Sequence, residues 1–131
     1  MHPPSSQYSR PFGAARWFVE HYVGGPTREI ESSIVLTPGV STTVAISNPD
    51  RVGLVFVNNS ASTILVVLSS EQSTGNNGIP VSAGGSIISM NVRDDFTLPA
   101  REWIAIGGAG IPVLYVLQIV SDIVTMEEPR P

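Results

Sequence analysis

Histidines and carboxylates are the side chains in this sequence best suited to chemistry, and their positions decide whether they can act together. The two histidines, His2 and His21, both precede the first predicted strand. A metal centre built between facing β-strands needs histidines on those strands, together with a carboxylate. Because no predicted strand contains a histidine, we assign His2 to solvent and His21 to packing. We expect no metal and no cofactor.

One acidic cluster remains to be considered, in which Arg93 precedes Asp94 and Asp95, with Glu102 nearby. Paired carboxylates can hydrolyse glycosidic bonds or hold calcium. Neighbouring residues of a strand point to opposite faces, so the two aspartates would not converge if the strand continued through them. We interpret the cluster as a solvated turn with Arg93 or Arg101 as the ion-pair partner, and calcium is the alternative.

Motifs for nucleophilic catalysis and for phosphate binding are missing from the sequence. No serine lies in a Gly-x-Ser-x-Gly elbow, and no histidine is placed to activate one. The glycine-rich stretch at residues 107–110 lacks a following Lys-Ser/Thr, so it is interpreted as a hairpin loop. Asn58-Asn59-Ser60 matches a glycosylation sequon, but the start of the chain lacks the regions of a signal peptide, and we interpret it as a turn. The expectation is a protein that is not an enzyme.

Composition indicates surfaces that are covered by something else. Hydrophobic residues make up 42% of the 131 residues and charged residues 14%, whereas about 25% is usual for charged residues. The net charge is −4 and all seven cations are arginines, which argues against nucleic acid and against a membrane surface as the partner. The absence of cysteine excludes disulfides and cysteine-ligated zinc. With no apolar run of membrane-spanning length, we expect synthesis in the cytoplasm.

Short apolar segments separated by Gly, Pro and Asn turn residues predict the fold. No helical period lies between them, so we expect an all-β, antiparallel, eight-stranded sandwich or jelly roll. This domain spans residues 33–120, after an extended N-terminal arm at 1–32 and before a short tail at 121–131. The predicted strands are Ser33–Thr37, Thr42–Ser47, Val52–Asn58, Thr63–Ser69, Ile79–Ser82, Ser86–Val92, Trp103–Gly107 and Pro112–Val120.

The arm carries an aromatic anchor, Trp17, Phe18 and Tyr22. Residues 12–23 are able to form a short helix, but a helix of that length is marginal by itself. Two adjacent large aromatic side chains exceed what an unattached tail requires. We therefore expect the anchor to dock either on the chain's own domain or on a neighbouring copy.

Three predicted strands are apolar on both faces, namely residues 52–57, 64–68 and 113–120, and in the last of these only Gln118 breaks the outer row. A sandwich strand normally alternates between the core and water. Burying one aliphatic side chain contributes about 1.5–3 kcal/mol, so several exposed together favour association. We predict an oligomer interface, with cover by the arm as the alternative. The predicted interface residues are Val55, Val57, Leu65, Val67, Leu114 and Val116.

Several segments of the domain resemble the small β-sandwich virion structural proteins of tailed bacteriophages, of the capsid decoration or cement type. In that family an arginine opens a strand that ends in Asn-x-Ser, and a Gly-Ile-x-Val-x-x-Gly-Gly segment precedes a polar strand. The resemblance covers a little over half of the chain. The matching segments are residues 49–60, 64–68, 78–85, 103–105 and 113–116.

The resemblance implies a structural protein of a virion that oligomerises, with a trimer favoured, and cements the capsid exterior. Its partner would be the major capsid protein or another virion protein. A tail, neck or fibre component and a lectin-like receptor-binding module are the alternatives. A receptor-binding module predicts aromatic side chains exposed in loops.

Overall fold

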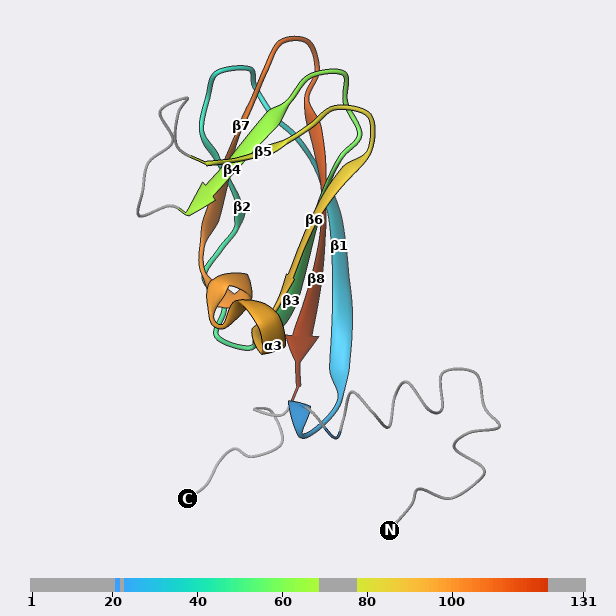
Figure 1. The fold of residues 1–131 in the computed structure, drawn as a ribbon, viewed down its shortest axis with the longest axis vertical. Helices are drawn as coiled ribbons and strands as arrows, with labels where there is room; N and C mark the ends of the chain where they lie inside the picture. Colours follow the sequence, from blue (N-terminus) through green and yellow to red (C-terminus); the bar gives the residue numbers. More distant parts are fainter. Residues whose placement is uncertain (1–20, 22, 69–77, 123–131) are drawn as a thin grey trace, which may run out of the picture.

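The computed structural model describes residues 21, 23–68 and 78–122 of the chain. Eight antiparallel strands form two four-stranded sheets that pack face to face (Figure 1). No helix among these residues is long and apolar enough to cross a membrane. The strands are β1 (Thr27–Val35), β2 (Thr42–Ala45), β3 (Arg51–Asn58), β4 (Ile64–Leu68), β5 (Ile79–Val81), β6 (Ser86–Asn91), β7 (Trp103–Gly107) and β8 (Val113–Ser121).

The strand order identifies a jelly roll. The first sheet runs β1-β8-β3-β6 and the second β2-β7-β4-β5. Four pairs of neighbours, β1 with β8, β2 with β7, β3 with β6 and β4 with β5, are those of one long hairpin. In the rolled-up hairpin the first and third pairs form one sheet, and the second and fourth pairs form the other. Such a roll of two Greek keys is found in viral capsid proteins, lectins and cupins. The predicted fold class is confirmed, and of the two predicted forms the observed one is the jelly roll.

Alternate side chains of both sheets form the core between them. Phe56 of β3 and Trp103 of β7 meet edge to face, with their ring centroids 6.0 Å apart. This geometry is favoured by the charge distribution of aromatic rings. The indole nitrogen of Trp103 donates to the Leu98 carbonyl at 3.0 Å, so the buried ring also fixes the loop before β7. The other core residues include Leu54, Ile64, Val66, Val81, Ala105, Leu114 and Val116.

The first strand begins at Thr27, six residues before the predicted start at Ser33. Its whole length pairs with β8, from Thr27 opposite Ser121 to Val35 opposite Val113. The boundary predicted after residue 32 is therefore wrong, because residues 27–32 belong to the sheet. The polar sequence of this segment hid the strand, since it lies at the edge of the sheet and most of its side chains are exposed.

Two short helical turns connect β6 to β7, where the sequence predicts only a turn. They are α3 (Val92–Asp95) and the 3-10 helix η2 (Leu98–Ala100). Asn91 caps α3 by accepting from the Asp94 amide at 2.9 Å, and its own amide donates to the Asp95 carboxylate at 2.9 Å. Reciprocal bonds of this kind satisfy amides that a helix start leaves without partners. The acidic pair therefore holds a chain reversal at the bottom of Figure 1.

Candidate assembly surfaces

The outer face of the first sheet is apolar over two neighbouring strands. Val55 and Val57 of β3 lie there half-buried. The strand register places Leu117 of β8 beside Val55, and Tyr115 beside Val57. On the other side of Val57 lies Ile87 of β6, which is largely exposed. We call the following residues the outer stripe: Val55, Val57, Ile87, Tyr115, Leu117 and Ile119.

Two of the predicted interface residues, Leu114 and Val116, are placed on the wrong face by the prediction. Both are fully buried in the core, at 0% exposure. Because β8 is apolar on both faces, the alternation of the sequence does not fix which row points inward. The prediction places Gln118 in the outer row, but Gln118 belongs to the inner row and accepts from the Arg51 guanidinium at 2.9 Å. The outward residues of β8 are instead Val113, Tyr115, Leu117 and Ile119.

The second sheet also carries apolar residues on its outer face. Leu65 of β4 is half-buried and lies opposite Ile106 of β7. Val67 lies opposite Ile104 and is already buried. Four of the six predicted interface residues therefore lie on outer faces, but they are divided between two sheets. One flat contact that uses the same sheet of both copies could cover either Val55 and Val57 or Leu65 and Val67, but not both sets.

One polar contact borders the outer stripe on the side of β1. The Tyr115 hydroxyl donates to the Glu31 carboxylate at 3.0 Å. This hydrogen bond, together with burial of the hydroxyl and the negative charge of Glu31, raises the pKa of Tyr115 above its ordinary value. Tyr115 therefore stays protonated over the neutral range, and the contact contributes a hydrogen bond rather than a second charge.

The two ends of the molecule differ in charge. The four loops at the top of Figure 1, residues 36–41, 59–63, 82–85 and 108–112, contain no charged residue. We call this the uncharged end, and it exposes Val35, Val40 and Ile111. The loops at the opposite end include Asp50, Asp94 and the other charged residues between β6 and β7. We call this the charged end.

Arg51 is the buried charge of the charged end and was not predicted as a structural residue. It is 1% exposed, and its guanidinium donates to the carbonyls of Ile46 at 2.6 Å and Pro99 at 3.0 Å as well as to Gln118. Burial lowers the pKa of Arg51. The hydrogen bonds connect the loop before β3, the loop before β7 and strand β8. A signal existed in the sequence, because Arg51 and Gln118 are isolated polar residues in two otherwise apolar strands.

Asn58 fixes the uncharged end in a similar way. Its amide nitrogen donates to the carbonyls of Ser62 and Val81, each at 2.8 Å. Its side-chain oxygen accepts from the Ser60 amide at 2.9 Å, which is the geometry of an Asx turn. The interpretation of Asn58-Asn59-Ser60 as a turn is confirmed, and the Asn58 side chain is fully buried.

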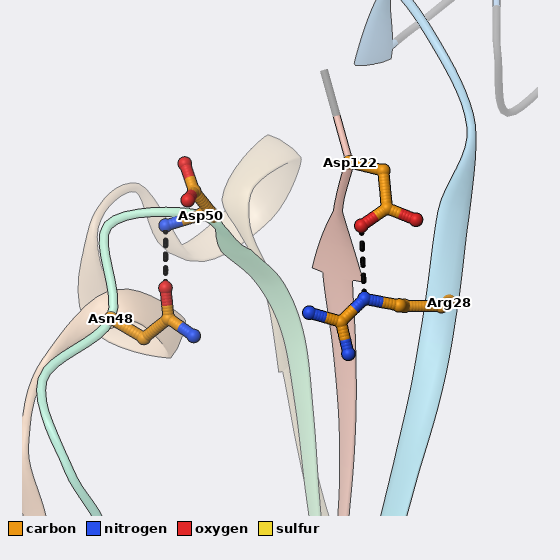
Figure 2. A network of polar contacts seen from close by, with 4 residues as sticks. All are labelled: Arg28, Asn48, Asp50 and Asp122. Carbon is orange, nitrogen blue, oxygen red and sulfur yellow. Dashed lines mark hydrogen bonds and ion pairs between the residues drawn. The ribbon is translucent and has the colours of Figure 1, made fainter. Parts of the chain in front are cut away.

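A second set of polar contacts closes the sheet where β1 begins and β8 ends. Arg28 and Asp122 form an ion pair of 2.9 Å across the two strands (Figure 2). In the neighbouring turn, the Asp50 amide donates to the Asn48 side chain at 2.9 Å. Exposed pairs of this kind contribute at most about 1 kcal/mol. They define the ends of strands and show no arrangement suited to a reaction.

No three His, Asp or Glu side chains in the described part of the chain lie close enough together to hold a metal ion. Asp94 and Asp95 are engaged with Asn91 at the start of α3. The predicted arm anchor of Trp17, Phe18 and Tyr22 lies outside the described residues.

Comparison with known proteins adds little to this description. No family model matches the chain, and no curated protein matches it. Among solved structures, it is similar to a protein from a study of Bacillus endospore appendages, described as a novel family of disulfide-linked pili. The TM-score is 0.46 at 13% identity, over 72% of this chain and 84% of that chain. A likeness of this size carries no argument about function, and this chain contains no cysteine.

Proposed function

We propose that this chain is a non-enzymatic structural subunit that forms a homo-oligomer through the outer stripe. The observation that supports the proposal is a continuous row of apolar side chains on the outer face, half-buried on β3 and β8 and largely exposed at Ile87 of β6. When one face of a sheet is in contact with water, the residues on that face are normally polar. Obligate interfaces resemble a core cut in half, and the outer stripe has that composition. Full burial of an exposed aliphatic side chain contributes about 1.5–3 kcal/mol; the half-buried members of the stripe contribute part of that each, and together they oppose the loss of freedom on association.

We propose further that the oligomer belongs to a tailed-bacteriophage particle, where it would decorate and stabilise the capsid. The support for this step is the resemblance over residues 49–60 and 78–85, together with a fold that viral capsid proteins use often. The fold by itself does not determine function. The partner would be the major capsid protein or another virion protein, and a tail, neck or fibre position is the variant of the same proposal.

Light scattering of the purified protein tests the oligomer. We expect a mass that is a multiple of the 13.9 kDa chain, with three copies favoured. Val57→Glu places a charge in the outer stripe and should reduce the mass toward one copy. Val40→Glu makes the same change at an exposed apolar residue of the uncharged end, outside the stripe, and should leave the mass unchanged. A wild-type protein that is monomeric at micromolar concentration would contradict the proposal.

Immunogold electron microscopy of the particles released on lysis tests the location. An antiserum against the purified protein should label the capsid exterior. Label confined to the tail would move the subunit to the tail, neck or fibre. Particles without any label, in a lysate that contains the protein, would refute the virion proposal while leaving the oligomer untouched.

The receptor-binding alternative has one observation in its favour. Phe96 lies in the loop between β6 and β7 and is 79% exposed, as the alternative predicts for loop aromatics. Trp103, by contrast, lies in the core. Phe96 also has an explanation within the chain itself, and the experiment below distinguishes the two.

A further inference from the structure

Four exposed apolar side chains belong to the loops of the charged end. Ile46 follows β2, and the other three belong to the connection between β6 and β7. The two loops are tied together, because the Asn48 amide donates to the Ala100 carbonyl at 2.9 Å and because Arg51 donates to a carbonyl in each loop. We call the following residues the end patch: Ile46, Val92, Phe96 and Leu98.

Phe96 is the most unusual residue of the end patch. Its backbone has φ 59° and ψ −123°, and it is the one non-glycine residue with positive φ in the described part of the chain. A side chain in such a conformation costs about 1–3 kcal/mol. At 79% exposure the ring gains little from its own domain in return. A strained and exposed aromatic residue is best explained by a contact made with something outside the described residues.

The surroundings of the end patch restrict what that contact can be. Its loops carry four acids, Asp50, Asp94, Asp95 and Glu102, against two exposed arginines, Arg93 and Arg101. A complementary ligand would therefore combine aromatic or aliphatic side chains with positive charge.

Residues 8–18 of this same chain have that composition. They contain Tyr8, Phe12, Trp17 and Phe18 with two arginines, Arg10 and Arg16, and no acid. They also precede β1, which begins at the charged end. Ten positions along the chain lead from Trp17 to Thr27, a span of up to about 33 Å for an extended chain and less here, because His21 and Val23 are helical. The two edge strands of the first sheet, β1 and β6, are about 14 Å apart, and the end patch lies where the chain leaves β6. The segment is therefore able to reach the end patch.

We propose that the end patch is the docking site for residues 8–18 of the chain, with Phe96 packed against the aromatic side chains and the arginines facing Asp94 and Asp95. A short tether gives the segment an effective concentration in the millimolar range, so even a weak contact is occupied within one copy. In an assembly the same contact is available to the arm of a neighbour, as in domain swapping. This inference does not depend on the outer stripe.

Trp17 fluorescence of the full-length protein tests the proposal. The chain has two tryptophans, and Trp103 is shielded in the core at 3% exposure. The Trp17→Phe variant gives the signal of Trp103 alone, so the difference reports Trp17. Docking predicts that acrylamide quenches Trp17 weakly in the wild type. Phe96→Ser should increase the quenching constant several-fold.

A matched control is Ile111→Ser, which removes an apolar side chain of similar exposure (75%) from the uncharged end. It should leave the quenching of Trp17 as in the wild type. Arg16→Gln should raise quenching and weaken its dependence on salt, because it removes one charge that faces the acids.

Free quenching of Trp17 in the wild type, or equal quenching with and without Phe96, would overturn the proposal and leave the end patch to a foreign receptor. Equal effects of the Phe96 and Ile111 variants would overturn it too. Val57→Glu separates this result from the oligomer test, since it should change the mass and leave Trp17 shielded.

Discussion

Replacing Arg51 with methionine tests how the charged end is held together. The guanidinium donates to four acceptors, the Gln118 side chain and the carbonyls of Ile46, Pro99 and Arg101, at 2.6–3.3 Å. Methionine fills much of the same volume without a single donor. All four acceptors then lose their partner in a region where the Arg51 side chain is almost fully excluded from solvent.

The expected loss follows from these contacts. A hydrogen bond to a charged group contributes about 1.5–3 kcal/mol. The four bonds do not add in full, because charging a buried guanidinium also has a cost and because the loop carbonyls regain some water. We expect the free energy of unfolding to fall by about 3–5 kcal/mol, because each buried acceptor left without a donor costs about 1–3 kcal/mol. This is a large part of the about 5–15 kcal/mol that is typical of a whole domain.

Urea denaturation measures the change directly. With a slope of about 2 kcal/mol per molar urea, the midpoint should fall by about 2 M without a change in slope. Arg101→Met is the control, since it removes an exposed arginine from the same end and should change the free energy of unfolding by less than about 0.5 kcal/mol. Arg51→Lys keeps the charge but lacks the planar fork of donors and should remain destabilised. An Arg51→Met midpoint equal to that of Arg101→Met would refute the role assigned to the guanidinium.

Three further predictions concern single residues. Phe96→Gly should be more stable than Phe96→Ala by about 1 kcal/mol, because both lack the ring and only glycine relieves the positive φ; equal thermal melts would show that the backbone there is unstrained. Tyr115 has a raised pKa in the fold, so its contribution is complete below the ordinary pKa of about 10 and is lost as pH rises beyond it. Tyr115→Phe should therefore show a smaller loss of stability between neutral and strongly alkaline pH than the wild type, and equal losses in urea melts would contradict this. Gly107→Ala should lower stability by about 1–3 kcal/mol, because a Cβ there would lie 2.6 Å from the Pro112 Cβ atom; an unchanged melting temperature would mean that the Pro112 loop moves aside freely.

Turn chemistry made most of the fold predictable from the sequence. The Asn-Pro-Asp turn before β3 and the Asn58 turn after it contain residues whose side chains cap their own backbone, and both boundaries of β3 agree with the prediction to within one residue. The start of β1 was less accessible to sequence reasoning. An exposed edge strand has no apolar row to mark it, and its existence depends on the free edge of β8, more than 80 residues later in the chain.

The outer faces were predictable in kind but not in every residue. Apolar residues on both faces of β3 and β8 predicted an apolar outer surface on the first sheet, and Val55 and Val57 lie on that surface. In β8 the choice between the two rows depended on Gln118, which we assumed to face water. Its direction is decided by Arg51, a residue 67 positions away in the sequence. The hydrophobic pattern of each strand shows one polar interruption, but neither pattern shows that the two polar residues pair with each other inside the core.

The distribution of charge restricts how a second copy can approach the apolar face of the first sheet. Glu29 and Glu31 border the outer stripe along β1, at the longest free edge of the first sheet. Charged residues on an edge strand discourage other strands from pairing there. A second copy can therefore approach the stripe face to face, where burying Val55, Val57 and Leu117 displaces no charge, but it meets carboxylates if it approaches along β1. The same glutamates disfavour any arrangement that sets one β1 over another, since like charges would then face each other. In the proposed oligomer, the glutamates of β1 thus favour one direction of approach to the outer stripe.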